Sequence, residues 1–499
     1  MSVADNYVFS VDWALAEHIA MFILMLIVGV RTNIRLNKKI LRPILTVAMC
    51  IPAYFYISYL WQDNLERNTG LNDTLFNAKY MHSKDGFFVS FILDIHFLQI
   101  EEPKNYSDEY ALSLLNEQEV EKVETPEELP DIIAIMDETF SDPAVLGEFE
   151  TNKDYMPFVH SILRGEVANT ISGYTDVSVL GGNTANSEFE FLTGNSMAFL
   201  PSGSVVYQQY ISDTPTSIVS NLKNIGYTCV AMHPYYETGW SRNAVYPTMG
   251  FDETHFIDDF DQTKLLRKYI TDQELYESIV ERYESKKANE DLFIMSISMQ
   301  NHGGYTEKYP NFNEQIRTLG ASYSDANQYL SLLHESDKAL EYLISYFQSV
   351  DDPVEIVFFG DHQPSLNTNF YKGLNGKGLS GLTEDELENL YTVPFFIWTN
   401  YETETEEVPI TSLNYLSTMA LERAGIALPS YNQFLADMQQ TIPAINSRGY
   451  YSVSSGCFKH LEEATGEEAE WIDKYQILQY NNMFDKKKQS KVFFPYLQE

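Results

Sequence analysis

VEIVFFGDHQ, residues 354–363, is a mostly apolar run that ends directly in Asp361 and His362. A short apolar run bounded by polar residues is typical of a buried strand. Three further runs end in the same way: residues 132–136 before Asp137 and Glu138, residues 228–232 before His233, and residues 292–299 before Gln300, Asn301 and His302. Ligands of open α/β sheets bind at the carboxyl ends of the strands, so we expect these polar side chains to share one crevice.

The stretch from residue 131 to about 430 alternates short apolar strands with amphipathic helices. The spacing predicts helices over residues 272–286 and 326–348, and a strand over residues 393–398. Alternation of this kind predicts an α/β domain with a mixed, mostly parallel sheet flanked by helices. We assign this domain to residues 131–450 and a C-terminal subdomain and tail to residues 451–499.

Composition excludes one class of partner. The chain has 499 residues and a net charge of −38. Because the phosphate backbone of nucleic acids would be repelled, we expect no nucleic acid partner. The three cysteines show neither a disulfide framework nor the spacing of a Cys/His metal site.

The N-terminal region holds two apolar runs, residues 13–30 and 43–61, each about long enough to cross a bilayer. The loop between them carries five basic residues and no acidic one, which predicts a cytoplasmic loop. Residues 1–62 are therefore expected to form two transmembrane helices, with a buried helical hairpin as the alternative. Residues 63–130 are read as a juxtamembrane helical connector. The protein would then be a multi-pass membrane protein whose large acidic domain lies outside the cell.

GGNTANSEFE, residues 181–190, is the most unusual segment of the chain. Glycines allow backbone amides to approach an anion closely, and a following helix would direct its positive end toward that anion. The hydroxyl of Thr184 becomes a useful nucleophile when a divalent cation lowers its pKa. The alternative is a Gly-Asn turn in which Thr184 caps a helix.

Four side chains supply candidate metal ligands: Glu138, Thr184, Asp361 and His362. Three oxygens and one imidazole nitrogen suit one divalent cation, which would be manganese, magnesium or zinc. Adjacent strand residues point to opposite faces, so we expect Asp137 to support the site rather than to bind the same ion. The alternative is that Asp361 only starts a loop and that His362 is a satisfied surface histidine.

Further side chains are candidates for substrate binding. His302 precedes two glycines and would bind phosphate oxygens or protonate a leaving alkoxide, unless it only caps a helix. Arg242 suits bidentate phosphate binding, and Trp240 would pack against a glycerol or lipid edge if it is not part of the core. His233 belongs to the same group.

These motifs together resemble the lipoteichoic acid synthase family, membrane phosphoglycerol transferases of the alkaline phosphatase/sulfatase superfamily. The resemblance rests on GGNTANSEFEFLTG around Thr184, NHGG at His302, FFGDHQP at Asp361 and the position of Glu138 after a strand. It implies that Thr184 is the nucleophile and that Glu138, Asp361 and His362 complete a manganese or magnesium site. It also implies that His302, Trp240, Arg242 and His233 line a phosphoglycerol pocket.

The expected reaction is transfer of glycerol phosphate from phosphatidylglycerol to an acceptor through a phosphoglyceryl-Thr184 intermediate. The acceptor would be a polyglycerolphosphate chain, a glycolipid or a wall polysaccharide. The alternatives are a phosphoethanolamine transferase or phosphodiesterase with the same site, and a catalytically silent envelope-binding protein. A sulfatase is disfavoured, since its nucleophile derives from Cys or Ser rather than Thr.

Overall fold

The computed structural model describes residues 41–60, 78–97, 100, 102–118, 128–211, 215–378 and 381–485. They form two compact units. The first contains the described residues up to Ile100 together with Ser202–Ser204, and the second contains the others.

The first unit is helical. It consists of α2 (Leu41–Leu60), α4 (Ala78–Asp85) and α5 (Phe87–Phe97). Leu60 at the end of α2 is buried with Ile92 and Leu93 of α5. Apolar side chains of the two helices therefore share a small core.

The predicted membrane spans have different outcomes. The span at residues 13–30 lies outside the described residues and stays a prediction. The span at residues 43–61 coincides with α2, which contains Pro52 and packs its last turn on α5. Over the described residues, no helix has the length and apolar character that crossing a bilayer requires. The second predicted span is thus helical, but the structure does not confirm it as a transmembrane helix.

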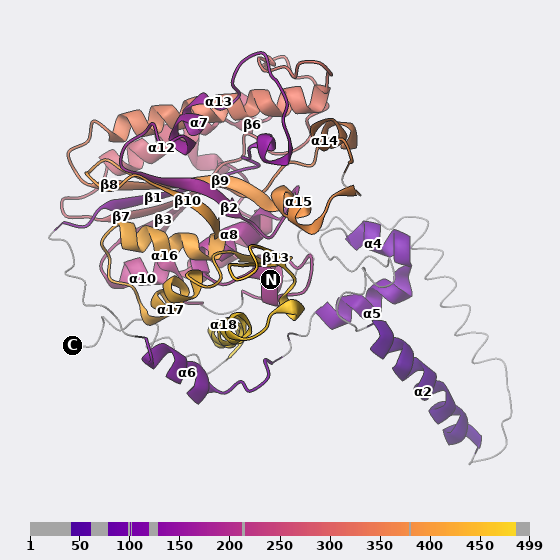
Figure 1. Ribbon diagram of the computed structural model, residues 1–499. Coiled ribbons are helices and arrows are strands. Elements are labelled where there is room, and N and C mark those ends of the chain that lie inside the picture. Colours follow the sequence, from indigo (N-terminus) through magenta and orange to yellow (C-terminus); the bar gives the residue numbers. More distant parts are fainter. Residues whose placement is uncertain are drawn as a thin grey trace. The chain divides into compact units, whose positions relative to one another are not determined.

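The second unit is built on an eight-stranded sheet with the order β10-β2-β9-β8-β1-β7-β3-β4 (Figure 1). Strand β9 is antiparallel to both of its neighbours, and the other adjacent pairs are parallel. The predicted α/β class with a mixed, mostly parallel sheet is confirmed. The strands are β1 (Asp131–Asp137), β2 (Thr170–Asp176), β3 (Thr228–Met232), β4 (Glu253–His255), β7 (Leu292–Ile297), β8 (Val354–Gly360), β9 (Thr392–Thr399) and β10 (Glu406–Ser412).

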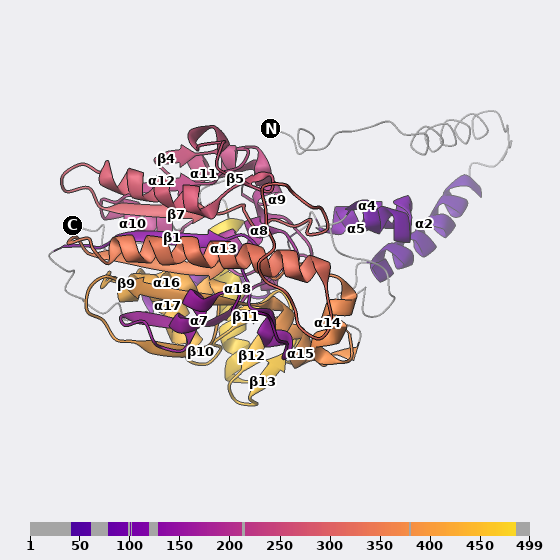
Figure 2. The same ribbon diagram turned by 90° about the horizontal axis from the view of Figure 1, so that it is seen from above.

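Helices cover both faces of this sheet, as Figures 1 and 2 show. Every residue of β1, β7 and β8 is buried, which explains their nearly continuous apolar sequences. One face carries α7 (Pro157–Leu163), α12 (Asp272–Glu284) and α13 (Ser324–Phe347). The other carries α8 (Thr184–Thr193), α10 (Ile218–Asn224), α16 (Leu413–Arg423) and α17 (Ser430–Gln439). The helices predicted over residues 272–286 and 326–348 are α12 and α13, and the strand predicted over 393–398 is β9.

Shorter elements connect these layers. They are α9 (Val206–Gln209), α11 (Arg242–Met249), α14 (Thr368–Asn375), α15 (Glu384–Glu388), β5 (Leu265–Leu266) and β6 (Tyr269–Ile270). A small antiparallel sheet follows, formed by β11 (Ile445–Asn446), β12 (Gly449–Ser452) and β13 (Cys457–Lys459).

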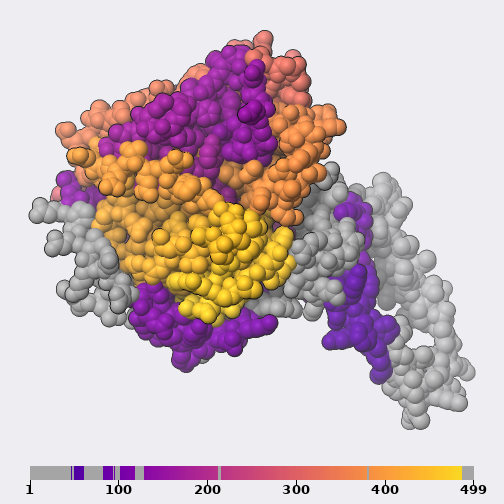
Figure 3. Space-filling view, in the orientation of Figure 1, coloured from indigo at the N-terminus to yellow at the C-terminus, as the bar shows by residue number. Residues whose placement is uncertain are grey.

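Two segments far apart in the sequence meet at one side of the second unit. Helix α6 (Asp108–Asn116) packs on α17 and on α18 (Glu467–Met483). Their cluster buries Leu114, Leu115, Phe434 and Tyr475, and Figure 3 shows the purple α6 region beside the yellow C-terminal region. The described residues after 450 thus belong to the same compact unit as the sheet.

One buried carboxyl group on α13 is expected to make the stability of the fold depend on pH. Asp337 accepts hydrogen bonds from the backbone amides of Phe158 and Val159 at the start of α7, at 3.0 and 2.8 Å. Burial raises the pKa of Asp337 to about 7, although the two amides oppose this shift. A group whose pKa is higher in the folded than in the unfolded state loses its stabilising effect as the pH rises.

We therefore expect the free energy of unfolding to fall as the pH rises from about 4 to about 7. In Asp337→Asn the free energy of unfolding should depend less on pH. Between pH 5 and pH 8 it should change by about 1–3 kcal/mol less in the variant than in wild type. Urea unfolding at pH 5 and pH 8 measures the difference. Identical pH dependence in both proteins would contradict this assignment.

Candidate metal centre and active site

The register of the central strands brings the polar strand ends together. Strands β1 and β8 are parallel, and Asp137 pairs with Gly360. The residues that follow, Glu138 and Asp361, therefore leave the sheet side by side. These two strand ends therefore meet at one edge of the sheet.

Glu138, Asp361 and His362 form a buried cluster that fits a metal ion. One ligand atom from each residue lies within 4.8 Å of the others. Asp361 Oδ2 and His362 Nε2 are buried and lie 3.3 Å from each other, and neither atom makes a hydrogen bond. His362 Nδ1 lies 2.9 Å from the backbone oxygen of Gln363, so Nδ1 donates and the lone pair of Nε2 faces the cluster. Buried ligand atoms that make no hydrogen bond are costly, and a cation bound between them would remove this cost, so these residues fit one.

Electrostatics support the same conclusion. Burial raises the pKa of Asp361 to about 7, and the neighbouring Glu138 carboxylate acts in the same direction. The backbone amide of Thr139 donates to Asp361 Oδ1 at 2.6 Å, and the Thr139 hydroxyl donates to Glu138 Oε1 at 2.8 Å. Thr139 thus orients two of the three candidate ligands, Glu138 and Asp361.

Thr184 lies beside this cluster at the first position of α8. Its hydroxyl donates to Glu138 Oε2 at 3.3 Å. Gly181 has a φ of +68°, and a Cβ there would meet Ser365 at 3.0 Å. The Gly181 amide donates to the Gln363 backbone oxygen at 2.9 Å, which fixes the loop before Thr184 against the loop after β8.

The first turn of α8 is held against the same loop. Ser187 donates its hydroxyl to the backbone oxygen of Asp361 at 2.6 Å. The start of a helix carries partial positive charge, so Thr184 stands where an anionic group is stabilised.

Strained backbone is concentrated around these side chains. Among the described residues, eight that are not glycine have a positive φ. Three of the eight, Thr139, Asn183 and Ser241, directly adjoin predicted site residues. Trp240 is itself a predicted site residue, and Arg267 donates to the backbone oxygen of His302. A left-handed conformation costs free energy for such residues and persists where the surrounding structure requires it. Its concentration here is typical of a functional site.

His233 and Arg242 form a buried group with Glu188 of α8. Arg242 is 1% exposed, and its Nε and Nη2 donate to Glu188 Oε2 at 3.1 and 2.9 Å. Its Nη1 lies 3.1 Å from His233 Nε2. Burial and the Arg242 charge hold the pKa of His233 well below its usual value, so its imidazole is neutral. Arg242 was expected to bind a phosphate with its guanidinium group. Two of the nitrogens of that group instead donate to the Glu188 carboxylate.

His302 and Trp240 are more accessible. His302 is exposed, and its Nδ1 lies 3.1 Å from the hydroxyl of Tyr269. Arg267 donates to the backbone oxygens of Gln300 and His302 at 2.9 and 2.7 Å, which anchors their loop. Trp240 is half-buried and has a φ of 53° immediately before α11.

Sequence reasoning missed four of these contributors: Thr139, Glu188, Arg267 and Tyr269. Glu188 follows Thr184 by four residues, so helical spacing alone places it one turn along from Thr184. Arg267 and Tyr269 have no such signal, because only the folded chain brings them to the loop that carries His302.

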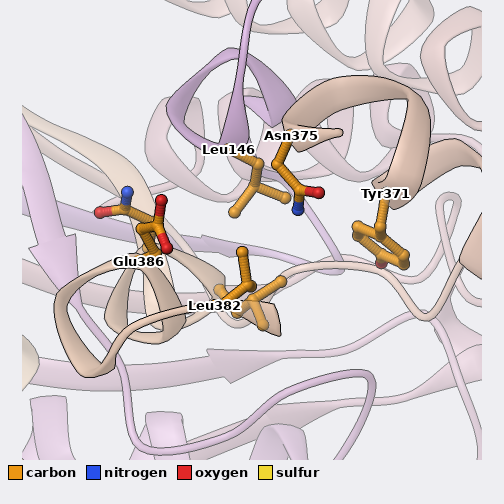
Figure 4. Close-up of a pocket in the computed structure, with 7 residues that line it drawn as sticks. Leu146, Tyr371, Asn375, Leu382 and Glu386 are labelled. Carbon is orange, nitrogen blue, oxygen red and sulfur yellow. The ribbon is translucent and has the colours of Figure 1, made fainter. Parts of the chain in front are cut away.

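A separate pocket lies between η3 (Pro143–Leu146), α14 and α15, and Figure 4 shows its lining. Leu146, Tyr371 and Leu382 contribute to its walls. None of the predicted site residues lines it, so it does not enter the chemistry considered below.

Comparisons with solved structures agree with this architecture. A phosphoglycerol transferase from Streptococcus pyogenes, solved with sn-glycerol-1-phosphate, has a TM-score of 0.66 at 23% identity and covers 79% of this chain and 99% of its own. A lipoteichoic acid synthase from Listeria monocytogenes has a TM-score of 0.52 at 16% identity, covering 77% and 98%. At these identities the likeness shows the fold.

Among curated proteins, a putative cyclic β-1,2-glucan modification protein from Rhizobium meliloti is 27% identical over 436 residues, which is 83% of this chain and 64% of the relative. A lipoteichoic acid synthase-like protein from Bacillus subtilis is 23% identical over 257 residues, 51% of this chain and 40% of the relative. The chain thus spans less than two thirds of these relatives.

The expected resemblance to lipoteichoic acid synthases, within the alkaline phosphatase/sulfatase superfamily, is confirmed by these comparisons. The sulfatase family model matches residues 130–426, which contain all the predicted site residues. Because this match covers more than half of the chain, the protein belongs to the sulfatase family.

Proposed function

We propose that this protein is a metal-dependent phosphoglycerol transferase, which moves glycerol phosphate from phosphatidylglycerol to a hydroxyl group of a cell-envelope polymer or glycolipid. One observation carries the proposal. The Thr184 hydroxyl lies 3.3 Å from Glu138 Oε2, at a helix N-terminus and beside the buried cluster of Glu138, Asp361 and His362. A nucleophile, metal ligands and an anion-binding helix end are thus combined in one place.

Glu138, Asp361, His362 and Thr184 would hold the cation, with manganese preferred over magnesium or zinc on the family resemblance. When bound, a divalent cation lowers the pKa of a coordinated hydroxyl and neutralises charge on phosphate oxygens. The protein's own contribution is to keep Thr184 at the positive end of α8 and to exclude water around the ligands.

The transfer takes two steps. In the first, Thr184 Oγ1 loses its proton and forms a bond to the phosphorus of phosphatidylglycerol, the bond between phosphorus and the diacylglycerol oxygen breaks, and that oxygen takes a proton. In the second, the acceptor oxygen loses its proton and forms a bond to the phosphorus, the bond between phosphorus and Thr184 Oγ1 breaks, and Thr184 regains a proton. A covalent intermediate allows a lipid donor and a polymer acceptor to bind in turn.

The remaining predicted residues receive supporting roles. His302 is exposed and stands on a Gly-rich loop, so it suits proton transfer to the leaving diacylglycerol oxygen. Trp240 offers an apolar surface to the glycerol group. Arg242 and the neutral His233 supply charge and a polar wall, with the position of Arg242 set by Glu188.

The acceptor is proposed from the relatives. The name of the Rhizobium relative indicates a glucan, and the name of the Bacillus relative indicates lipoteichoic acid. Both offer a hydroxyl to the same site. The predicted membrane hairpin of residues 13–30 and 43–61 would keep the site near its lipid donor, on the outer side of the membrane.

The test uses the full chain with manganese and one fluorescent lipid at a time. We expect labelled diacylglycerol from phosphatidylglycerol and little from phosphatidylethanolamine. Separate reactions with a β-1,2-glucan or a glycerol phosphate polymer identify the acceptor by its mass increase. Release from phosphatidylethanolamine alone would instead assign a phosphoethanolamine transferase, and no release from either lipid would reject the proposal.

A further inference from the structure

A continuous series of buried hydrogen bonds joins Glu138 to the loop that carries His302. The Glu138 amide donates to Ser298 Oγ at 3.0 Å, and Ser298 Oγ donates to Asp137 Oδ1 at 3.0 Å. Asn301 Nδ2 donates to the same Asp137 oxygen at 3.2 Å. The metal ligand and the proposed proton donor, His302, are therefore tied to a common carboxylate.

Ser336 extends this network to α13. Its hydroxyl accepts from Gln300 Nε2 at 3.0 Å and from Asn301 Nδ2 at 2.9 Å, and it donates to Asp272 Oδ2. A serine hydroxyl offers one donor and two acceptor positions, so all of its hydrogen-bonding capacity is used. Ser336 is 0% exposed.

Asp272 closes the network at the first position of α12. It accepts from Ser336, and its backbone amide donates to Gln300 Oε1 at 3.2 Å. Two long helices, α12 and α13, therefore hold the two residues that immediately precede His302. Neither Asp272 nor Ser336 belongs to the candidate metal cluster.

Around His302 the loop is open, and its other restraints come from Arg267, Tyr269 and Tyr305. Gly303 and Gly304 have open space where a Cβ would be, and Gly304 has a φ of +101°. His302 itself is exposed. Besides this network, Arg267 and Tyr305 bond to backbone oxygens of the loop. The side-chain amides of Gln300 and Asn301 both donate to Ser336, which links them. Asp272 and Asp137 supply their other hydrogen bonds.

We infer that Ser336 and Asp272 are positioning residues, which set His302 relative to Glu138 without touching substrate or metal. This inference rests on the proposed function, because it assigns the purpose of the network to proton transfer by His302. Misplacing a reacting group by about 1 Å can cost about 100-fold in rate.

The principal test compares Ser336→Ala with Ser331→Ala. Ser331 is a matched control, since it is also buried on α13. Its hydroxyl accepts hydrogen bonds from the backbone amides of Gln315 and Ile316, which lie outside the loop of His302. We expect kcat to fall about 10- to 100-fold in Ser336→Ala with little change in KM. Both variants should lose thermal stability, whereas Ser331→Ala should keep its turnover.

Two further variants separate positioning from stability. Asp272→Asn retains an oxygen that accepts from Ser336 and should stay near wild-type turnover, whereas Asp272→Ala should resemble Ser336→Ala. In a His302→Ala background, Ser336→Ala should have less than about twofold further effect, because residues that act through one another are not additive. Full additivity would overturn the inference.

Amide hydrogen exchange gives a readout that does not require activity. The peptide covering residues 298–305 should exchange faster in Ser336→Ala than in wild type, and should be unchanged in Ser331→Ala. If wild type transfers nothing, the proposed function fails, and the exchange still decides whether Ser336 holds the loop. Unchanged exchange in Ser336→Ala would overturn the inference.

Discussion

Thr184→Ala is expected to lower phosphoglycerol transfer at least about 1,000-fold, because it removes the only atom proposed to bond to phosphorus. Thr184→Ser should retain part of the activity, since it keeps the hydroxyl at the N-terminus of α8. The measurement is release of labelled diacylglycerol from phosphatidylglycerol by the full chain. Mass spectrometry of quenched wild type should also show Thr184 carrying one glycerol phosphate less one water.

Thr193→Ala is the matched control for this experiment. Thr193 is also a buried threonine of α8, and its hydroxyl donates to the Phe189 backbone oxygen at 2.7 Å. Its loss should lower stability slightly and leave transfer unchanged. Wild-type activity in Thr184→Ala, or an adduct on another residue, would refute the threonine mechanism.

Asp361→Asn is expected to weaken manganese binding at least about 100-fold and to lower transfer in parallel. The substitution keeps an oxygen that accepts from the Thr139 amide, so the local backbone contact survives. It removes the negative charge that faces Glu138 and His362. Calorimetric titration with manganese alone measures the affinity, and transfer is assayed after removal and restoration of the metal.

Asp337→Asn is the control for the loss of a buried carboxylate. Asp337 bonds to the amides at the start of α7 and lies outside the candidate cluster, so its replacement should leave manganese affinity unchanged. Equal affinity in wild type and Asp361→Asn would show that the cluster does not hold the ion.

Much of the fold could be predicted because its signals are local. The apolar runs at residues 132–136, 292–299 and 354–360 become the fully buried strands β1, β7 and β8, as their nearly continuous apolar character indicates. The helical spacing over residues 326–348 becomes α13. The antiparallel direction of β9 has no comparable signal, since a buried strand reads alike in either direction.

The candidate metal cluster could also be predicted from the sequence. Glu138 and Asp361 each follow a buried strand, and parallel strands end at the same edge of a sheet. The pairing of Arg242 with Glu188 could not be foreseen, because both were read by residue type and not by neighbour. The predicted span at residues 43–61 shows the same limit: its apolar character indicates a helix but does not decide what surrounds it.

The sequence by itself determined the α/β class, the strand ends and the identity of the side chains that could bind a cation, because hydrophobic periodicity and residue chemistry are properties of short segments. Only the tertiary structure decided which strands are neighbours, that Thr184 meets Glu138, and that Ser336 and Asp272 support the loop of His302. Those contacts join residues separated by tens to hundreds of positions, and they depend on register and helix packing, which no short segment encodes.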